Sequence, residues 1–134
     1  MATTRRESLS VTANDAVVLV RQSVREFAVE TRLSLVDQTK LVTAASELAR
    51  NMVVYGGGGT VVLEQIEDNG RAGVRITFED QGPGIANVEE AMRDGFTSGS
   101  GLGLGLGGSK RLVHDFNLRT EVGRGTTIVI TRWK

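Results

Sequence analysis

The sequence predicts one α+β domain covering residues 1–134, with long helices early in the chain and strands and loops later. All 17 glycines lie at Gly56 or beyond, so the part before Gly56 favours long regular elements and the remainder is divided by turns. The early part carries two amphipathic helical patterns, and the later part carries β-branched runs joined by a strong hairpin signal. A chain of this length buries about two-thirds of its unfolded surface in one core.

The first elements are a strand and a helix. Residues 8–12 alternate apolar with hydroxyl side chains, which predicts a short strand at a sheet edge. Asn14 or Asp15 then offers an N-cap, and valines at helical spacing predict an amphipathic helix to about Glu30.

A second helix is predicted from Ser34 to about Val54. Asp37 follows Ser34 by three residues, which is typical of a capped helix start, and the glycines after Tyr55 predict the end. The side chains expected to face the core are Leu41, Ala44 or Ala45, Leu48, Met52 and Tyr55. Glu47 and Asn51 stand four residues apart and share one face of this helix. An isolated pair of this kind is typical of a solvated face, so the pair alone predicts no site.

A hairpin follows, with strands over residues 60–67 and 74–80 and a turn at Asp68-Asn69-Gly70. Counting by twos along the second strand places Asp80 at the end of its apolar face. A carboxylate there needs a hydrogen-bond partner or an open pocket.

Two roles for Asp80 remain open. Its side chain can cap the turn at residues 81–84, or it can accept a hydrogen bond from a ligand amine such as the exocyclic amino group of adenine. Gly82 and Gly84 would let the backbone approach the ring, and Pro83 restricts the turn between them.

The last part of the chain carries further short elements. They are a helix at 87–93 capped by Asn87, a lid-like segment at 94–101, a helix at 109–116, and strands at 118–122 and 126–133 joined by a turn at 123–125. The final strand is apolar on both faces near its centre, which predicts an interior position in the sheet. His114 is expected on the surface of the helix at 109–116.

The stretch Gly99–Leu112 alternates glycine with leucine and predicts a phosphate-binding loop that leads into a helix. Two familiar nucleotide motifs do not fit it. The dinucleotide fingerprint at residues 103–108 should directly follow a core strand, and here a polar loop precedes it. A phosphate-loop NTPase needs Gly-Lys-Ser or Gly-Lys-Thr, and the order at Gly108 is Gly-Ser-Lys.

Composition excludes several classes of protein. The 16 basic and 16 acidic side chains cancel, which argues against a nucleic-acid partner or an anionic membrane surface. The chain has no cysteine, and so has neither disulfides nor thiolate metal ligands. The start of the sequence has no apolar run typical of a signal peptide or membrane span, so we expect a cytoplasmic protein.

Three separated motifs together carry a resemblance. Glu-x-x-x-Asn at residues 47–51, Asp-x-Gly-x-Gly at 80–84 and the later Gly-x-Gly-x-Gly resemble the GHKL (Bergerat-fold) ATPase superfamily. Within it, the chain is similar to the bacterial switch-protein serine/threonine kinases and anti-sigma regulatory factors. The resemblance implies a two-layer α/β sandwich, with helices on one face of a mixed, mostly antiparallel sheet.

The resemblance also implies roles for single residues. Glu47 is the expected general base, Asn51 the ligand of Mg²⁺, and Asp80 the acceptor for the adenine amine, while Thr126 lies near the adenine. The residues expected to contact ATP further include Gly82, Gly84, Gly101, Leu102, Gly103, Leu104 and Gly105. Lys110 either reaches a phosphate or is a solvated lysine, since an exposed charge there gains little.

The function implied is an ATP-dependent kinase that phosphorylates serine or threonine on STAS-domain antagonist or scaffold proteins in a stressosome-type partner-switching pathway. After release from these partners, the kinase would activate a downstream phosphatase. The alternative is an anti-sigma factor that sequesters a sigma subunit in an ATP-dependent manner. A homodimer stays open in both cases.

Overall fold

A five-stranded sheet with helices on one face forms the fold, and the strand order is β1-β2-β3-β5-β4. This computed structural model describes residues 1–93 and 105–134. The elements are β1 (Ala2–Val11), α1 (Asn14–Glu30), α2 (Leu35–Gly56), β2 (Gly59–Asp68), β3 (Arg71–Asp80), α3 (Val88–Ala91), α4 (Gly105–Arg111), β4 (Asp115–Glu121) and β5 (Gly125–Trp133). The strand pairings β1–β2, β2–β3, β3–β5 and β4–β5 are all antiparallel.

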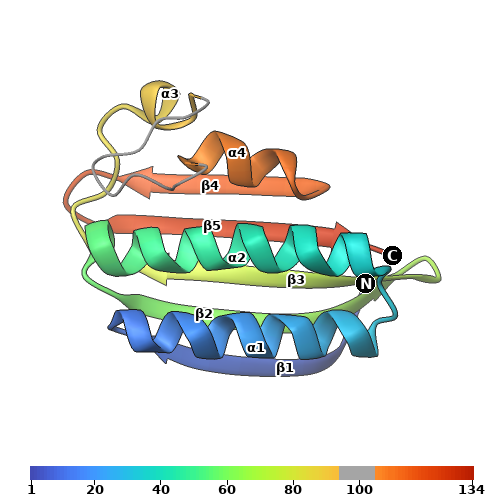
Figure 1. The fold of residues 1–134 in the computed structure, drawn as a ribbon. Helices are drawn as coiled ribbons and strands as arrows, with labels where there is room; N and C mark the ends of the chain where they lie inside the picture. The colour runs from blue at the N-terminus through green and yellow to red at the C-terminus, as the bar shows by residue number, and fades with distance from the viewer. Residues whose placement is uncertain (94–104) are drawn as a thin grey trace.

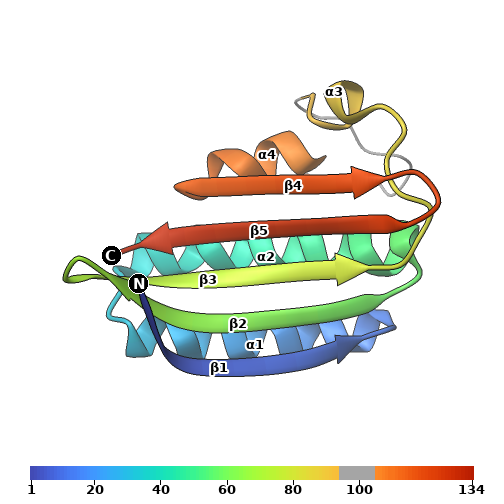
Figure 2. The same cartoon turned by 180° about the vertical axis from the view of Figure 1, so that it is seen from behind.

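The two long helices cover one face of the sheet, and the view from behind shows the strands in front of them (Figures 1 and 2). The predicted α+β fold class is therefore confirmed. β1 is an edge strand and β5 an interior strand, as predicted, although β1 begins at Ala2, well before the predicted start. Of the helices in the described part of the chain, none is long and apolar enough to span a membrane.

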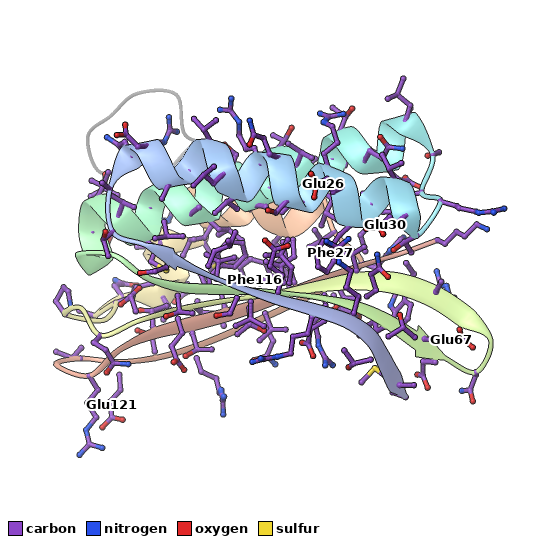
Figure 3. All side chains as sticks on the ribbon, turned by 90° about the horizontal axis from the view of Figure 1, so that it is seen from below. Glu26, Phe27, Glu30, Glu67, Phe116 and Glu121 are labelled. Atoms are coloured by element: carbon purple, nitrogen blue, oxygen red, sulfur yellow. The ribbon has the colours of Figure 1, made fainter. Side chains whose placement is uncertain are left out.

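The core lies between the helices and the sheet. Phe27 of α1 has no exposed surface, and Figure 3 shows Phe27 and Phe116 between the helical layer and the strands. Val74, Ile76 and Phe78 face this core from β3, as the period of two predicts. The prediction that Tyr55 faces the core is wrong, because Tyr55 is 40% exposed at the last turn of α2.

Sequence predictions are confirmed at two places where a turn or a helix cap depends on only a few residues. Ser34 accepts the Asp37 N–H at 3.1 Å and caps α2, and the turn residues Asn69 and Gly70 have φ angles of 52° and 78°. The capping expectation for α1 is wrong: its N-cap is Ala13, which offers no side-chain hydrogen bond.

The region after the glycine stretch differs most from expectation. α4 begins at Gly105 and ends at Arg111, so the predicted helix at 109–116 is wrong and Phe116 lies in β4. Glycine has low intrinsic helix propensity, but Gly105 and Gly107 are buried where α4 packs beside α2, and packing overrides propensity. His114 is not on a helix, and its Nδ1 accepts the Trp133 N–H at 2.9 Å. Burial lowers the pKa of this imidazole.

One ion pair joins the start of α2 to β5. Arg132 donates from Nη2 to Asp37 Oδ1 at 2.6 Å and from Nη1 to the Leu112 carbonyl at 3.1 Å. The hydrogen bond from Arg132 holds the pKa of the Asp37 carboxyl below its ordinary value. These contacts connect the chain just after α4 to both layers of the domain.

Candidate functional site

A cavity of ≈ 430 Å³ opens at the end of the sheet where α2 finishes and β3 ends. Its walls come from α2, α3, the start of α4, and the ends of β3 and β5. Leu48, Met52, Phe78 and Ile128 form an apolar wall that is continuous with the core. Glu47, Asn51, Asp80 and Thr126 supply polar groups to the same cavity. An apolar pocket with a few convergent polar groups is typical of a small-ligand site.

Glu47 and Asn51 reach this cavity from adjacent turns of α2. Glu47 is only 8% exposed, so the interpretation of the pair as a solvated helix face does not apply to it. Its Oε2 accepts a hydrogen bond from Arg50 Nη2 at 2.6 Å. A buried carboxylate is costly without a partner, and this ion pair offsets the cost.

Asp80 combines the two roles left open by the sequence. Its Oδ1 accepts the Gly82 N–H at 2.9 Å and so caps the turn, while the side chain also lines the cavity. The other oxygen, Oδ2, lies against the end of α2, where a Cβ built on Gly56 would come within 2.6 Å of it. Gly56 is therefore a site residue that sequence periodicity could not single out.

The turn after Asp80 is packed tightly against the β4–β5 hairpin. Gly84 has a φ of 77°, and a Cβ there would come within 2.4 Å of the Glu121 carbonyl oxygen. The Gly123 N–H donates to the Pro83 carbonyl at 2.8 Å, and the Ile85 N–H donates to Thr120 Oγ1 at 2.9 Å. These contacts hold the turn beside the cavity, so its backbone is preorganised.

Thr126 lies directly opposite Asp80 in the β3–β5 register. The Thr126 residue is 9% exposed, and its hydroxyl is 2.9 Å from the Thr120 hydroxyl. Thr126 and Asp80 are therefore neighbouring residues in the cavity wall. The strand pairing itself fixes this proximity.

The glycine stretch is only partly described. Gly105 is buried at the start of α4 with a φ of 69°, and both Gly105 and Leu106 line the cavity. The predicted lid at 94–101 and the expected phosphate contacts at Gly101, Leu102, Gly103 and Leu104 lie outside the described residues. Lys110 is exposed on α4, on the part of the helix beyond the cavity wall.

Several cavity residues were missed by the sequence interpretation, Glu90 and Leu106 among them. Glu90 lies on α3, and Leu106 lies on the part of α4 that was predicted as loop. No local signal marks either one, because the cavity reaches them only through the packing of α3 and α4.

The donor set fits a nucleotide with a hard cation. The Asn51 carboxamide oxygen is a ligand that Mg²⁺ accepts, and phosphate oxygens are its usual further ligands. Among residues 1–93 and 105–134, no three His, Cys, Asp or Glu side chains gather as a metal site. The absence of a side chain at Gly56 lets the Asp80 carboxylate pack against the end of α2 in the cavity wall.

Comparison with known proteins identifies the family. Residues 36–134 match the family described as histidine kinase-, DNA gyrase B-, and HSP90-like ATPase. The chain belongs to this ATPase family. The matched region contains the four polar residues of the cavity that were expected to bind ATP or take part in catalysis: Glu47, Asn51, Asp80 and Thr126.

Individual relatives agree with that assignment. The chain is 45% identical over 117 residues to the serine/threonine-protein kinase RsbT of Bacillus subtilis, covering 87% of this chain and 88% of that protein. It is 28% identical over 120 residues to the anti-sigma F factor of a Geobacillus strain, covering 84% and 81%. A solved structure of RsbU and RsbW domains from Mycobacterium tuberculosis shares the fold, with a TM-score of 0.69 and 21% identity over 98% of this chain and 33% of that one.

Proposed function

We propose that this chain is an ATP-dependent serine/threonine protein kinase of a bacterial partner-switching pathway. The observation that carries the proposal is one cavity that collects Glu47, Asn51, Asp80 and Thr126 from α2, β3 and β5 in a member of the ATPase family. The 45% identity to a named serine/threonine-protein kinase supports the same function.

In the proposed complex, adenine occupies the cavity beside Asp80. The Asp80 carboxylate accepts a hydrogen bond from the exocyclic amine, and the Thr126 hydroxyl lies next to it. Asn51 would hold Mg²⁺, which neutralises part of the phosphate charge when it is bound. Gly84 lines the cavity, whereas Gly82 packs against the Gly56 backbone and does not line it. Gly105 begins the helix nearest the expected phosphate loop.

The proposed reaction transfers the γ-phosphoryl group of ATP to a serine or threonine hydroxyl. The hydroxyl oxygen forms a bond to the γ-phosphorus while the bond from that phosphorus to the β–γ bridging oxygen breaks. ADP leaves with the electron pair, and Glu47 accepts the hydroxyl proton. Phosphoryl transfer depends mainly on positioning and charge neutralisation, which one oriented carboxylate and a nucleotide bound with its cation would supply.

The proposed acceptors are STAS-domain antagonist or scaffold proteins, and a downstream phosphatase would be engaged after release from them. The similarity to RsbT supports this assignment. A kinase with such partners would act in the cytoplasm.

The test is phosphotransfer from Mg-ATP to candidate STAS proteins. We expect phosphoserine or phosphothreonine on one of them with wild-type protein, and about 10²- to 10⁴-fold slower transfer with Glu47→Gln while nucleotide binding is retained. Asp80→Asn should instead weaken nucleotide binding. Glu64→Gln is the matched control, because the Glu64 side chain is similarly buried and paired with an arginine, but lies on the uncovered face of the sheet.

If Glu47→Gln transferred the phosphoryl group at the wild-type rate, Glu47 would not be the general base. Absence of transfer from the wild type to every STAS candidate would count against the kinase proposal.

The second candidate is an anti-sigma factor, and the 28% identity to an anti-sigma F factor favours it. Purification from cell extract distinguishes the two. A sigma subunit that co-purifies in the presence of ATP, without phosphorylation of any STAS protein, would favour sequestration over phosphotransfer.

A further inference from the structure

Arg50 is paired with the proposed base, although no role has so far been assigned to it. The Arg50 Nη2 atom donates to Glu47 Oε2 at 2.6 Å, which is short for a charge-assisted hydrogen bond. The Glu47 side chain is 10% exposed and the Arg50 side chain is 33% exposed. The pair therefore runs from the cavity wall toward the surface of α2.

Helix geometry separates Arg50 from the groups that line the cavity. Glu47 and Asn51 are four residues apart and share the cavity face, whereas Arg50 lies about 100° around the helix axis from Asn51. Arg50 thus reaches the Glu47 carboxylate from the side of α2. Its contact engages Oε2 and leaves Oε1 as the second acceptor of the same carboxylate.

We propose that Arg50 is a positioning residue that orients Glu47 for proton abstraction. The inference rests on the proposed kinase function. A carboxylate on a flexible side chain has several rotamers, and a hydrogen bond to one oxygen selects among them. With Oε2 held by the guanidinium, Oε1 is the atom that accepts the proton of the serine or threonine hydroxyl. The positive charge of Arg50 also offsets the cost of burying this carboxylate in the cavity wall.

This role predicts which property of Arg50 matters. A lysine at this position keeps the charge and can donate one hydrogen bond, although it lacks the planar fork of the guanidinium. A glutamine is shorter, stopping two bonds before the Nη2 atom that contacts Glu47, and it loses the charge. Arg50→Lys should therefore retain much more activity than Arg50→Gln.

The experiment is a double-mutant cycle on phosphotransfer to a STAS acceptor, with ATP hydrolysis as a second reaction. It compares wild type, Glu47→Gln, Arg50→Gln, Arg50→Lys and the Glu47→Gln/Arg50→Gln double variant. Affinity for a non-hydrolysable ATP analogue and thermal unfolding are measured on each protein. Arg75→Gln is the matched control, because Arg75 is paired with Glu64 on the uncovered face of the sheet.

We expect Arg50→Gln to slow transfer by up to about 10²-fold, the loss typical of a misplaced catalytic group, with analogue affinity within about twofold of wild type. Arg50→Lys should recover most of that loss, and Arg75→Gln should match wild type. In the Glu47→Gln background, Arg50→Gln should have no further effect, because both changes disable one unit.

Three results would each overturn this inference without affecting the proposed function. The first is a wild-type transfer rate for Arg50→Gln, and the second is an equal loss of analogue affinity, which would make Arg50 a nucleotide ligand. The third is a double variant whose loss of rate equals the product of the two single losses. A wild-type protein that neither phosphorylates an acceptor nor hydrolyses ATP would overturn the proposed function, and this inference with it.

Discussion

The helices α1 and α2 lie side by side on the same face of the sheet, yet only α2 contributes to the cavity (Figure 1). The buried residues of α1 are all apolar: Val17, Val20, Val24, Phe27 and Ala28. The buried residues of α2 include Glu47 among alanines, leucines and a methionine. The two helices therefore differ in role although they pack on the same face of the sheet. α1 contributes apolar side chains to the core, whereas α2 contributes both core side chains and the polar groups of the cavity.

The ends of the two helices differ as well. α2 begins after the Ser34 cap and ends at Gly56, and Gly57 follows as the C-cap with a φ of 75°, which glycine adopts without strain. α1 begins without a side-chain cap and is followed by Arg32, which adopts a φ of 65°. The helix that carries the site thus has favourable capping residues at both ends. α1 lacks them, so its stability depends more on the packing of its buried face.

The largest expected effect tests the core role of α1. Phe27→Ala removes a fully buried ring that also lies 4.3 Å from the Arg5 guanidinium, so we expect a loss of about 3–5 kcal/mol in the free energy of unfolding. Urea denaturation measures this loss. Nucleotide affinity of the molecules that remain folded should be unchanged, because Phe27 lies outside the cavity.

The control for this prediction is Val29→Ala on the same helix. Val29 is 53% exposed, and its truncation should change stability by no more than about 0.5 kcal/mol. Weakened nucleotide binding in folded Phe27→Ala protein would contradict the division of roles between the two helices.

A smaller effect is expected at the helix ends, with opposite signs. The Arg32 N–H donates to the Val29 carbonyl and the Leu33 N–H to the Ala28 carbonyl, both at 3.0 Å, in the pattern of a Schellman cap that favours glycine. Arg32→Gly should therefore stabilise the protein by about 0.5–1 kcal/mol. Gly57→Ala should destabilise it by about 1 kcal/mol, because a Cβ there meets no atom within 4 Å and only the backbone conformation is penalised.

Thermal unfolding of both variants decides this prediction. If the two substitutions shifted the melting temperature in the same direction, the left-handed backbone would not be the cause.

The smallest expected effect concerns pH and the first turn of α2. The pKa of Asp37 lies below its ordinary value of 3.8 because Arg132 donates a hydrogen bond to it. An acid with a lowered folded-state pKa contributes stability above its unfolded pKa and loses it as the pH falls through the folded pKa. Asp37→Asn should therefore make the loss of stability below about pH 4 shallower.

The measurement is urea denaturation from neutral to acidic pH. Asp15→Asn, at the first turn of α1, is the matched control for the loss of one carboxylate near a helix start. Equal acid sensitivity of Asp37→Asn and wild type would show that the Arg132 contact does not contribute to stability through the Asp37 charge.

Much of the fold was predictable where the signal is local. The Ser34 cap, the Asn69-Gly70 turn and the alternation in β3 each depend on backbone geometry within a few residues. The prediction failed at α4, where glycines form a helix because they are buried against α2 and small residues permit that approach. It failed again at Tyr55, whose helical spacing matches the core although the last turn of α2 extends to the cavity mouth.

The sequence by itself determined that Glu47 and Asn51 share a helix face and that Asp80 ends an apolar strand face, because helix and strand periods are properties of the local backbone. Only the tertiary structure decided that these groups share one cavity, that Thr126 stands opposite Asp80, and that Gly56 must lack a side chain beside Asp80. The physical reason is that α2, β3 and β5 are far apart in sequence. Their relative placement follows from strand register and helix packing, which no single segment encodes.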